Sequence, residues 1–266
     1  MTWIVGANSF FGQAILASDI CVTITSKSKQ KSYSDCLQKV YPLGRFVIGG
    51  FAGSVCIGFA MMDSLHREFS TTSNEEAWNL DIVANTWLPR VTKRVFKLAS
   101  EVERKLGCQI ILATVHPTKN RGDAPYPWTD IYIFSSPEFK PVKANQNQVL
   151  GIGSGSSVAV YMNAIQAACN DFTFHQTAMG GDTAQGRLIA SVVEKTVKEN
   201  PISGVSSFFQ VALVNRIHFK IFNHEYDIYP PGQPKIEIRC PSIAKNFPQF
   251  RQIMKDNGWI SEGTVC

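Results

Sequence analysis

The sequence predicts an α+β fold in which two antiparallel β-sheets pack face to face, with helices covering the outer face of each sheet. Two observations predict this arrangement. Short apolar runs typical of strands occur near the start, in the middle and near residue 210, and two blocks between them repeat apolar residues at helical spacing. The resulting order is strands, helix pair, strands, helix pair, strands, which lacks the strand–helix alternation of a parallel sheet.

The first strands are predicted at residues 2–7 and 14–19, which are short apolar runs separated by a turn that contains glycine. Residues 19–39 are polar and rich in serine, threonine and lysine, and no strand or helix is assigned there. Apolar runs at residues 38–43 and 46–50 then predict a second strand pair, which turns at a Pro-Leu-Gly-Arg sequence.

A helical period begins after Ser54, where apolar residues recur at intervals of three or four. These residues are Val55, Phe59, Met62, Leu65 and Phe69. A second helical stretch is predicted after residue 76, and its later half begins just after Pro89, a residue that helices tolerate at their start. The apolar positions of that half are Val91, Val95, Leu98 and Val102.

The remaining elements follow the same two signals. Strands are predicted at residues 108–115, 130–134, 149–152, 207–214 and 217–222, and helices at residues 156–169 and 182–199. The composition changes after residue 222, where a proline-rich link precedes an alternating segment at 235–240 and one short helix within 244–257. We therefore predict a domain at residues 1–222 and a C-terminal extension at 223–266 that packs on the domain or on a neighbouring subunit.

Composition excludes several classes of protein. The chain of 266 residues is 44% hydrophobic and 18% charged, which suits one sizeable core and argues against disorder. Its 26 Lys and Arg residues exceed the 21 Asp and Glu residues to give a net charge of +5, and the basic residues are scattered, so no nucleic-acid partner is expected. The uncharged runs are interrupted by glycine and other small or polar residues, so no membrane span is expected.

Cysteine and histidine usage predicts a reduced, metal-free protein. The seven cysteines form no C-x-x-C pair and their odd number fits no closed disulfide framework, so reduced thiols and a cytoplasmic location are expected. The five histidines show no zinc-binding spacing, and no G-x-S-x-G nucleophile motif occurs. We expect neither a metal nor an organic cofactor.

Thr2 is the first residue with a chemical signal. Methionine is generally removed when a small residue such as threonine follows it, and the chain would then start with Thr2. An N-terminal threonine carries a hydroxyl nucleophile and an α-amine that titrates at about 7.7–8.0, so one residue supplies both the nucleophile and its base. Many cytosolic proteins also start with Met-Thr, so this signal alone is weak.

Three further features strengthen the signal at Thr2. Asp19 ends the returning strand, which brings it back beside the N-terminus, and Lys39 leads the next apolar pair. The glycine-rich segment from Gly49 to Ser54 closes a strand and opens a helix, where backbone N–H groups can stabilise an oxyanion. A surface ion pair is the simpler interpretation of Asp19 and Lys39 taken singly, but their combination with Thr2 favours a catalytic set.

These segments resemble the proteasome β-subunit family. The similar stretches are TWIVG at 2–6, LASD at 16–19, KV at 39–40, VIGGFAG at 47–53 and GIGSGS at 151–156. The bacterial HslV-type branch, which carries the same Gly-Phe-Ala-Gly run, and the related bacterial proteasome homologue are the nearest in pattern. The resemblance spans about residues 2–222 and implies a four-layer α/β/β/α sandwich of the N-terminal-nucleophile (Ntn) hydrolase type that acts as a threonine peptidase.

The resemblance implies a role for each matching residue. Thr2 is the nucleophile, Lys39 lowers the pKa of the Thr2 amine by like charge, and Asp19 orients Lys39. The N–H of Gly53 stabilises the oxyanion. The other implied supporting residues are Ser154 and Ser203 in the catalytic network, Thr23 on the substrate main chain, and Val22, Tyr41, Phe51 and Val55 around the primary specificity pocket, although these last four are equally well interpreted as core.

The resemblance also implies partners. Peptides or unfolded proteins are the expected substrates, the subunits are expected to form a homo-oligomeric double ring, and a hexameric ATP-dependent unfoldase is a possible partner. Ring size and natural substrates are not indicated by the sequence.

Three departures from the family pattern put details in doubt. The interval from Asp19 to Lys39 is a few residues longer than in the family, with the extra length in residues 26–34. Asn200 stands where proteasome subunits have an aspartate, and an amide cannot supply its charge. The interval from Ser154 to Ser203 is also long, with the surplus within residues 175–187.

Two other functions remain open from the sequence. Retention of Met1 would block the Thr2 amine and favour a non-catalytic ring or scaffold subunit with the same fold. An amidase of the Ntn type acting on small substrates is the other alternative. A dinucleotide site at residues 151–156 is less favoured, because the glycines there lack the G-x-G-x-x-G spacing.

Overall fold

The computed structural model describes residues 2–8, 12–25, 30–71, 83–123, 126–145, 147–171 and 183–259. Its first sheet has five strands in the order β10-β1-β2-β11-β12, all paired antiparallel. The strands are β1 (Ile4–Asn8), β2 (Ala14–Asp19), β10 (Leu150–Ile152), β11 (Phe209–Val214) and β12 (Phe219–Asn223). Segments that are distant in sequence therefore meet beside the N-terminal strand.

The second sheet also has five strands, in the order β5-β6-β7-β8-β9, and it too is antiparallel throughout. Its strands are β5 (Val40–Gly44), β6 (Val47–Gly53), β7 (Cys108–Asn120), β8 (Pro127–Ser135) and β9 (Lys140–Lys143). The prediction of two antiparallel sheets built from separate blocks of strands is confirmed.

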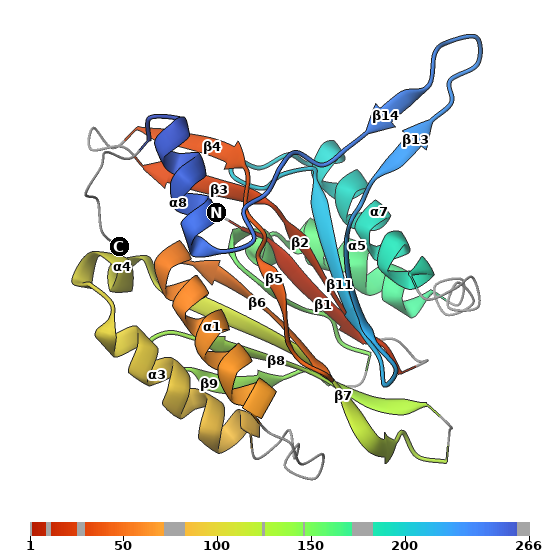
Figure 1. The fold of residues 1–266 in the computed structure, drawn as a ribbon. Helices are drawn as coiled ribbons and strands as arrows, with labels where there is room; N and C mark the ends of the chain where they lie inside the picture. The colour runs from red at the N-terminus through yellow and green to blue at the C-terminus, as the bar shows by residue number, and fades with distance from the viewer. Residues whose placement is uncertain are drawn as a thin grey trace.

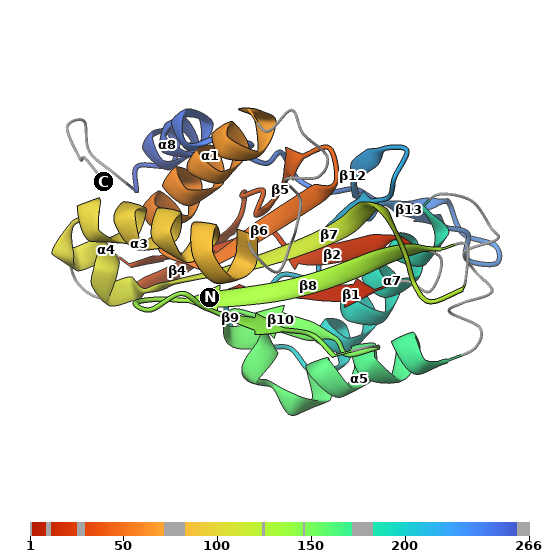
Figure 2. The ribbon, with the colours of Figure 1, turned by 90° about the horizontal axis from the view of Figure 1, so that it is seen from below.

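Helices pack on both sheets. The α-helices are α1 (Val55–Thr71), α3 (Leu88–Leu98), α4 (Glu101–Leu106), α5 (Ala159–Asn170), α7 (Ala184–Glu199) and α8 (Phe247–Asp256), with a π-helix η2 (Val83–Trp87) and a 3₁₀ turn η3 (Ser154–Ser157). Helices α1 and α3 share an apolar core with the second sheet, and α5 and α7 share another with the first. Figure 2 shows these two helix pairs on opposite sides of the strands.

A third apolar cluster joins the two sheets. Ile4 and Leu16 of the first sheet lie in one buried cluster with Ile48, Ile111 and Ile131 of the second, and all five side chains are fully buried. Burying an aliphatic side chain of this size contributes roughly 1.5–3 kcal/mol. This cluster fixes the N-terminal strand against the strand pair that follows Lys39.

Several elements differ from the sequence prediction. The polar stretch 19–39 contains a hairpin of β3 (Cys21–Thr25) and β4 (Lys31–Asp35), which the sequence does not signal because the exposed side of β4 is polar. The predicted helix through residue 102 is interrupted, since the Ser100 hydroxyl accepts the N–H of Glu103 and starts α4. Strands β7 and β8 extend beyond the strands predicted at 108–115 and 130–134, and β9 was not predicted.

The expectation of reduced cysteines holds only in part. The free cysteines among the described residues are Cys21, Cys36, Cys108, Cys169 and Cys240. Cys56 near the start of α1 is instead disulfide-bonded, which contradicts the expectation at that position. Cys266 lies outside the described residues. Within the part of the chain that the structure describes, no helix is long and apolar enough to cross a membrane.

The C-terminal segment contains a second hairpin and a helix. Strands β13 (Tyr226–Ile228) and β14 (Ile236–Ile238) form a two-stranded sheet that projects from the body of the molecule (Figure 1). The alternating segment at 235–240 is therefore a strand, as predicted, but its partner β13 was not predicted. Helix α8 lies within the predicted residues 244–257. The division into 1–222 and 223–266 stays a prediction.

His224 connects this segment to α7. The buried imidazole lies 3.2 Å from the Glu194 carboxylate, measured from Nε2 to Oε2. Burial lowers the pKa of His224 below its ordinary value of 6.5, and the Glu194 charge opposes this shift only in part. The native protein thus binds fewer protons at this site than the unfolded chain does.

This shift predicts how stability depends on pH. Because the folded pKa lies below the unfolded one, the contribution of His224 is present above about pH 6.5 and is lost as the pH falls below that value. We expect the free energy of unfolding in urea to fall between pH 7.5 and pH 5.5, and the fall to be smaller in His224→Gln. An equal fall in both proteins would exclude His224 as its source.

Candidate active site

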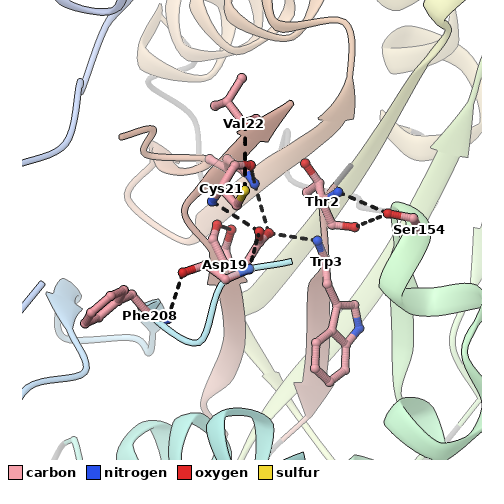
Figure 3. Close-up of polar contacts among 10 residues, drawn as sticks. Thr2, Trp3, Asp19, Cys21, Val22, Ser154 and Phe208 are labelled. Carbon is pink, nitrogen blue, oxygen red and sulfur yellow. Dashed lines mark hydrogen bonds and ion pairs between the residues drawn. The ribbon is translucent and has the colours of Figure 1, made fainter. Parts of the chain in front are cut away.

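Thr2 is held against the turn that precedes α5. Its side chain is 7% exposed, and its backbone N–H donates to the Ser154 hydroxyl at 3.2 Å. The Ser154 hydroxyl in turn donates to the Thr2 carbonyl oxygen at 3.4 Å, and the N–H of Gly155 donates to the same oxygen at 3.2 Å. Figure 3 shows Thr2 facing Ser154 across this pair of contacts. The structure therefore brings together Thr2 and Ser154, as the sequence predicts.

Glycine at position 153 is required for this approach. Gly153 has φ +83° and ψ −177°, a conformation that is open almost only to glycine. A Cβ on Gly153 would lie 2.2 Å from the carbonyl oxygen of Thr2. The glycine-rich sequence at 151–156 thus serves close packing against the N-terminal residue.

We expect Gly153→Ala to lower both stability and any activity that depends on Thr2. The backbone conformation alone costs roughly 1–3 kcal/mol for a residue with a side chain, and the contact with Thr2 adds to it. Gly232→Ala is a suitable control, because Gly232 also has positive φ (+69°) but a Cβ there would meet nothing within 4 Å. Equal losses of unfolding free energy in the two variants would contradict the proposed contact.

Asp19 and Lys39 form a buried ion pair. Lys39 Nζ lies 2.9 Å from Asp19 Oδ1, and the side chains are 2% and 0% exposed. Lys39 Nζ also donates to the carbonyl oxygen of Cys21 at 2.5 Å. The alternative of a surface pair is therefore wrong for these two residues.

Backbone N–H groups donate the remaining hydrogen bonds to the Asp19 carboxylate. Oδ1 accepts the N–H of Trp3 at 2.8 Å, and Oδ2 accepts the N–H groups of Cys21 at 3.2 Å and Ser206 at 3.4 Å. A buried charge costs little only when it is paired and hydrogen-bonded in this way. Because Trp3 directly follows Thr2, Asp19 also fixes the backbone of the N-terminal residues (Figure 3).

Gly53 lies at the predicted position between strand and helix. It ends β6, is exposed and has φ +99°, and a Cβ there would lie 2.4 Å from the carbonyl oxygen of Gly107. The following Ser54 donates its N–H to the same oxygen at 2.9 Å, and its hydroxyl accepts the N–H of Ile57 to cap α1. This turn requires glycine for steric reasons whether or not Gly53 binds an oxyanion.

The four predicted pocket residues lie together. Val22 and Phe51 are buried, Tyr41 and Val55 are half-buried, and all four pack in the core shared with α1. The rings of Tyr41 and Phe51 stack with centroids 6.2 Å apart. Burial raises the pKa of Tyr41 well above its ordinary value. The structure thus supports their shared location, while their role as a substrate pocket stays a prediction.

Ser203 and Thr23 are the remaining predicted site residues. Ser203 is exposed in a turn, and the residue of this segment that reaches Asp19 is Ser206. Thr23 lies in β3 opposite Tyr33. Asn200 ends α7, where its side-chain amide donates to the carbonyl oxygen of Thr196, so it does not take the place of a carboxylate beside Asp19.

Sequence reasoning missed the residues that act through backbone groups. The amides of Trp3 and Ser206 and the carbonyl of Cys21 carry no side-chain signal. Asp35 was also missed: its carboxyl is hydrogen-bonded by the Ser206 side chain, and burial raises its pKa, with the Asp19 charge adding to the rise. Its only sequence signal is its place four residues before Lys39. Burial likewise raises the pKa of the Cys21 thiol to about 12.

The site combines a hydroxyl, a backbone nitrogen that becomes an amine at a free N-terminus, and a buried ammonium–carboxylate pair. This set suits proton transfer and nucleophilic attack by Thr2. Among the described residues, no group of three or more His, Cys, Asp or Glu side chains is placed to hold a metal ion.

Comparison with known proteins gives a limited likeness. No family model matches the sequence, and no curated protein is similar enough to match it. The chain is similar in fold to the crystal structure of eukaryotic HslV from Trypanosoma brucei, with 15% sequence identity, a TM-score of 0.48, and coverage of 80% of this chain and 99% of that chain. A likeness at this level does not decide an activity, which depends on the side chains at the site.

Proposed function

We propose that this protein is a threonine peptidase of the proteasome β-subunit type, on a four-layer α/β/β/α fold, with Thr2 as its nucleophile after removal of Met1. The observation that carries the proposal is the fully buried pair of Lys39 and Asp19, which also fixes the amide that follows Thr2. Burying an ammonium costs desolvation free energy, so the position of Lys39 against the N-terminal strand indicates a functional role and not a gain in stability.

The chemistry follows from these groups. The Thr2 hydroxyl attacks the substrate carbonyl carbon while its proton passes to the Thr2 α-amine, and the Gly53 N–H stabilises the oxyanion. Cleavage of the C–N bond gives the leaving amine the proton held by the α-amine and leaves an ester on Thr2. The α-amine then takes a proton from water, which attacks the ester carbonyl carbon. Cleavage of the ester C–O bond releases the acid, and the α-amine returns the proton to the Thr2 oxygen. Lys39 keeps the α-amine neutral by like charge, and Ser154 orients it.

Assembly and partners belong to the same proposal. We propose peptides or unfolded proteins as substrates and a homo-oligomeric double ring, with an ATP-dependent unfoldase as a possible partner and a cytoplasmic location. The exposed apolar residues Val102 and Leu106, which are four positions apart on one side of α4, support assembly together with the exposed Leu98 at the end of α3.

Covalent labelling tests the proposal. A peptide epoxyketone has two electrophilic carbons, one for the hydroxyl and one for the amine, so a cyclic adduct forms only on a residue that offers both. We expect one adduct per chain, located on Thr2 by peptide mass spectrometry. An adduct confined to cysteine or lysine side chains would contradict the proposed nucleophile and leave the scaffold alternative.

A further inference from the structure

The C-terminal segment is bonded to the residues that lead into Lys39. The N–H of Ala244 donates to the carbonyl oxygen of Cys36 at 2.8 Å, and the N–H of Gln38 donates to the carbonyl oxygen of Ala244 at 3.0 Å. These two bonds form a parallel β-bridge between Leu37 and Ala244. One isolated β-bridge thus joins residues that are more than 200 positions apart in the chain.

The opposite side of the same residues is bonded next to Asp19. The N–H groups of Cys36 and Leu37 both donate to the carbonyl oxygen of Ile20 at 3.1 Å. Lys39 lies two residues after Leu37, and its own carbonyl oxygen accepts the N–H of Phe51 at 3.2 Å. The backbone before Lys39 is therefore held on one side by the strand end that carries Asp19 and on the other by Ala244.

Helix α8 fixes Ala244 in this position. The Asn246 side chain caps the helix by accepting the N–H of Gln249 at 3.0 Å. The Phe247 ring packs against Phe59 of α1 with centroids 5.8 Å apart. Ala244 is 1% exposed and lies in the same apolar core as Leu37, together with Phe250 and Met254 of the helix.

We propose that residues 244–256 are a positioning element of the active site, which holds the backbone before Lys39 so that its ammonium stays paired with Asp19. The proposal rests on the proposed function and gives the C-terminal segment a role in it. Lysine has a long and flexible side chain, so its reach is defined only when its backbone is fixed. Loss of the Ala244 bridge would let Lys39 move and weaken its effect on the Thr2 amine.

The test variant is Ala244→Pro, which removes the donor to Cys36. Ile243→Pro is the matched control, because within the described part of the chain the Ile243 amide donates no hydrogen bond that the structure shows. Thermal unfolding establishes that each variant is folded. The readouts are kcat and KM for a peptide substrate across pH, and the pKa of the Thr2 amine in the mature protein, measured from the pH dependence of its acetylation.

We expect the amine pKa to be below about 7.7–8.0 in the parent protein. In Ala244→Pro it should rise by about half a unit or more, because the like charge of Lys39 is farther away or less ordered. The acid limb of the pH–kcat profile should move to higher pH, and kcat should fall about tenfold with little change in KM. Ile243→Pro should behave like the parent.

The two proposals fail in different ways. A lowered amine pKa in the parent that is unchanged in Ala244→Pro would overturn the positioning role alone. An ordinary amine pKa in the parent, or an amine blocked by Met1, would contradict the proposed function and the positioning role with it. Where Ala244→Pro does not fold, Phe247→Ala takes its place with the same expected direction, and an unshifted amine pKa in that folded variant would overturn the inference.

Discussion

Thr2→Ala removes peptide hydrolysis from the mature protein, with a fall in kcat of at least about 10³-fold. The reason is that the substitution deletes the hydroxyl that forms the ester, while the neighbouring Cys21 thiol stays protonated because burial raises its pKa to about 12. Binding of a peptide substrate should persist, because the backbone contacts of residue 2 with Ser154 and Gly155 do not depend on its side chain. Hydrolysis of a fluorogenic peptide by the two purified proteins measures the effect.

Thr2→Ser is the matched variant. It keeps the hydroxyl and the α-amine and deletes only a methyl group, so it should retain a measurable part of the parent rate. Thr2→Ala with the parent rate would assign the hydrolysis to another residue or to a contaminant. A Thr2→Ser protein as inactive as Thr2→Ala, although folded, would weaken the assignment of the hydroxyl.

The second prediction is that substitution of Asp19 and substitution of Lys39 have different effects on stability and on peptide hydrolysis. Asp19→Ala leaves the Lys39 ammonium buried without its carboxylate, which costs roughly 3–5 kcal/mol of unfolding free energy. Lys39→Met keeps the aliphatic volume and leaves Asp19 with the backbone donors from Trp3, Cys21 and Ser206, so it should cost less. We nevertheless expect Lys39→Met to lower peptide hydrolysis about 10²-fold, because the amine then loses its like-charged neighbour.

Urea unfolding and hydrolysis rates, measured on both variants, give the comparison. The exposed pair of Glu101 and Lys105 supplies the control, because its side chains are 72% and 75% exposed and such pairs contribute at most about 1 kcal/mol. Lys39→Met with the parent rate would contradict the mechanism, whatever its stability. Equal destabilisation by Lys39→Met and Asp19→Ala would contradict the account of how Asp19 is satisfied.

The sequence predicts the parts of this fold that depend on hydrophobic period. The strand that follows Thr2, the strand that ends at Asp19 and the helix that begins at Val55 follow from apolar spacing, and the structure confirms them. The hairpin of β3 and β4 does not follow from it. Its outer strand is polar, and its pairing depends on the bonds of Cys36 and Leu37 to Ile20, which no residue pattern signals.

The residues of the candidate site also divide into those that the sequence indicates and those that it does not. The resemblance to the proteasome β-subunit family implied that Ser154 contacts Thr2 and that Asp19 pairs with Lys39, and the glycines at 151–156 indicated a turn that serves the Thr2 site. Ser206 and Ala244 act through their backbones, so their contribution depends on tertiary placement alone. Ser203 illustrates the limit of transferring a role by position, since the turn leaves it exposed and brings Ser206 to Asp19 instead.

In the proposed mechanism, Thr2 becomes the free N-terminal residue of the chain and acts through its hydroxyl and amine. The intact mass of the protein expressed in a bacterial cytoplasm tests this most directly. We expect the mass of the chain without Met1, with residue 2 recovered first by N-terminal sequencing. Full retention of Met1 would leave Thr2 without a free amine, contradict the peptidase mechanism and favour a structural role for the same fold.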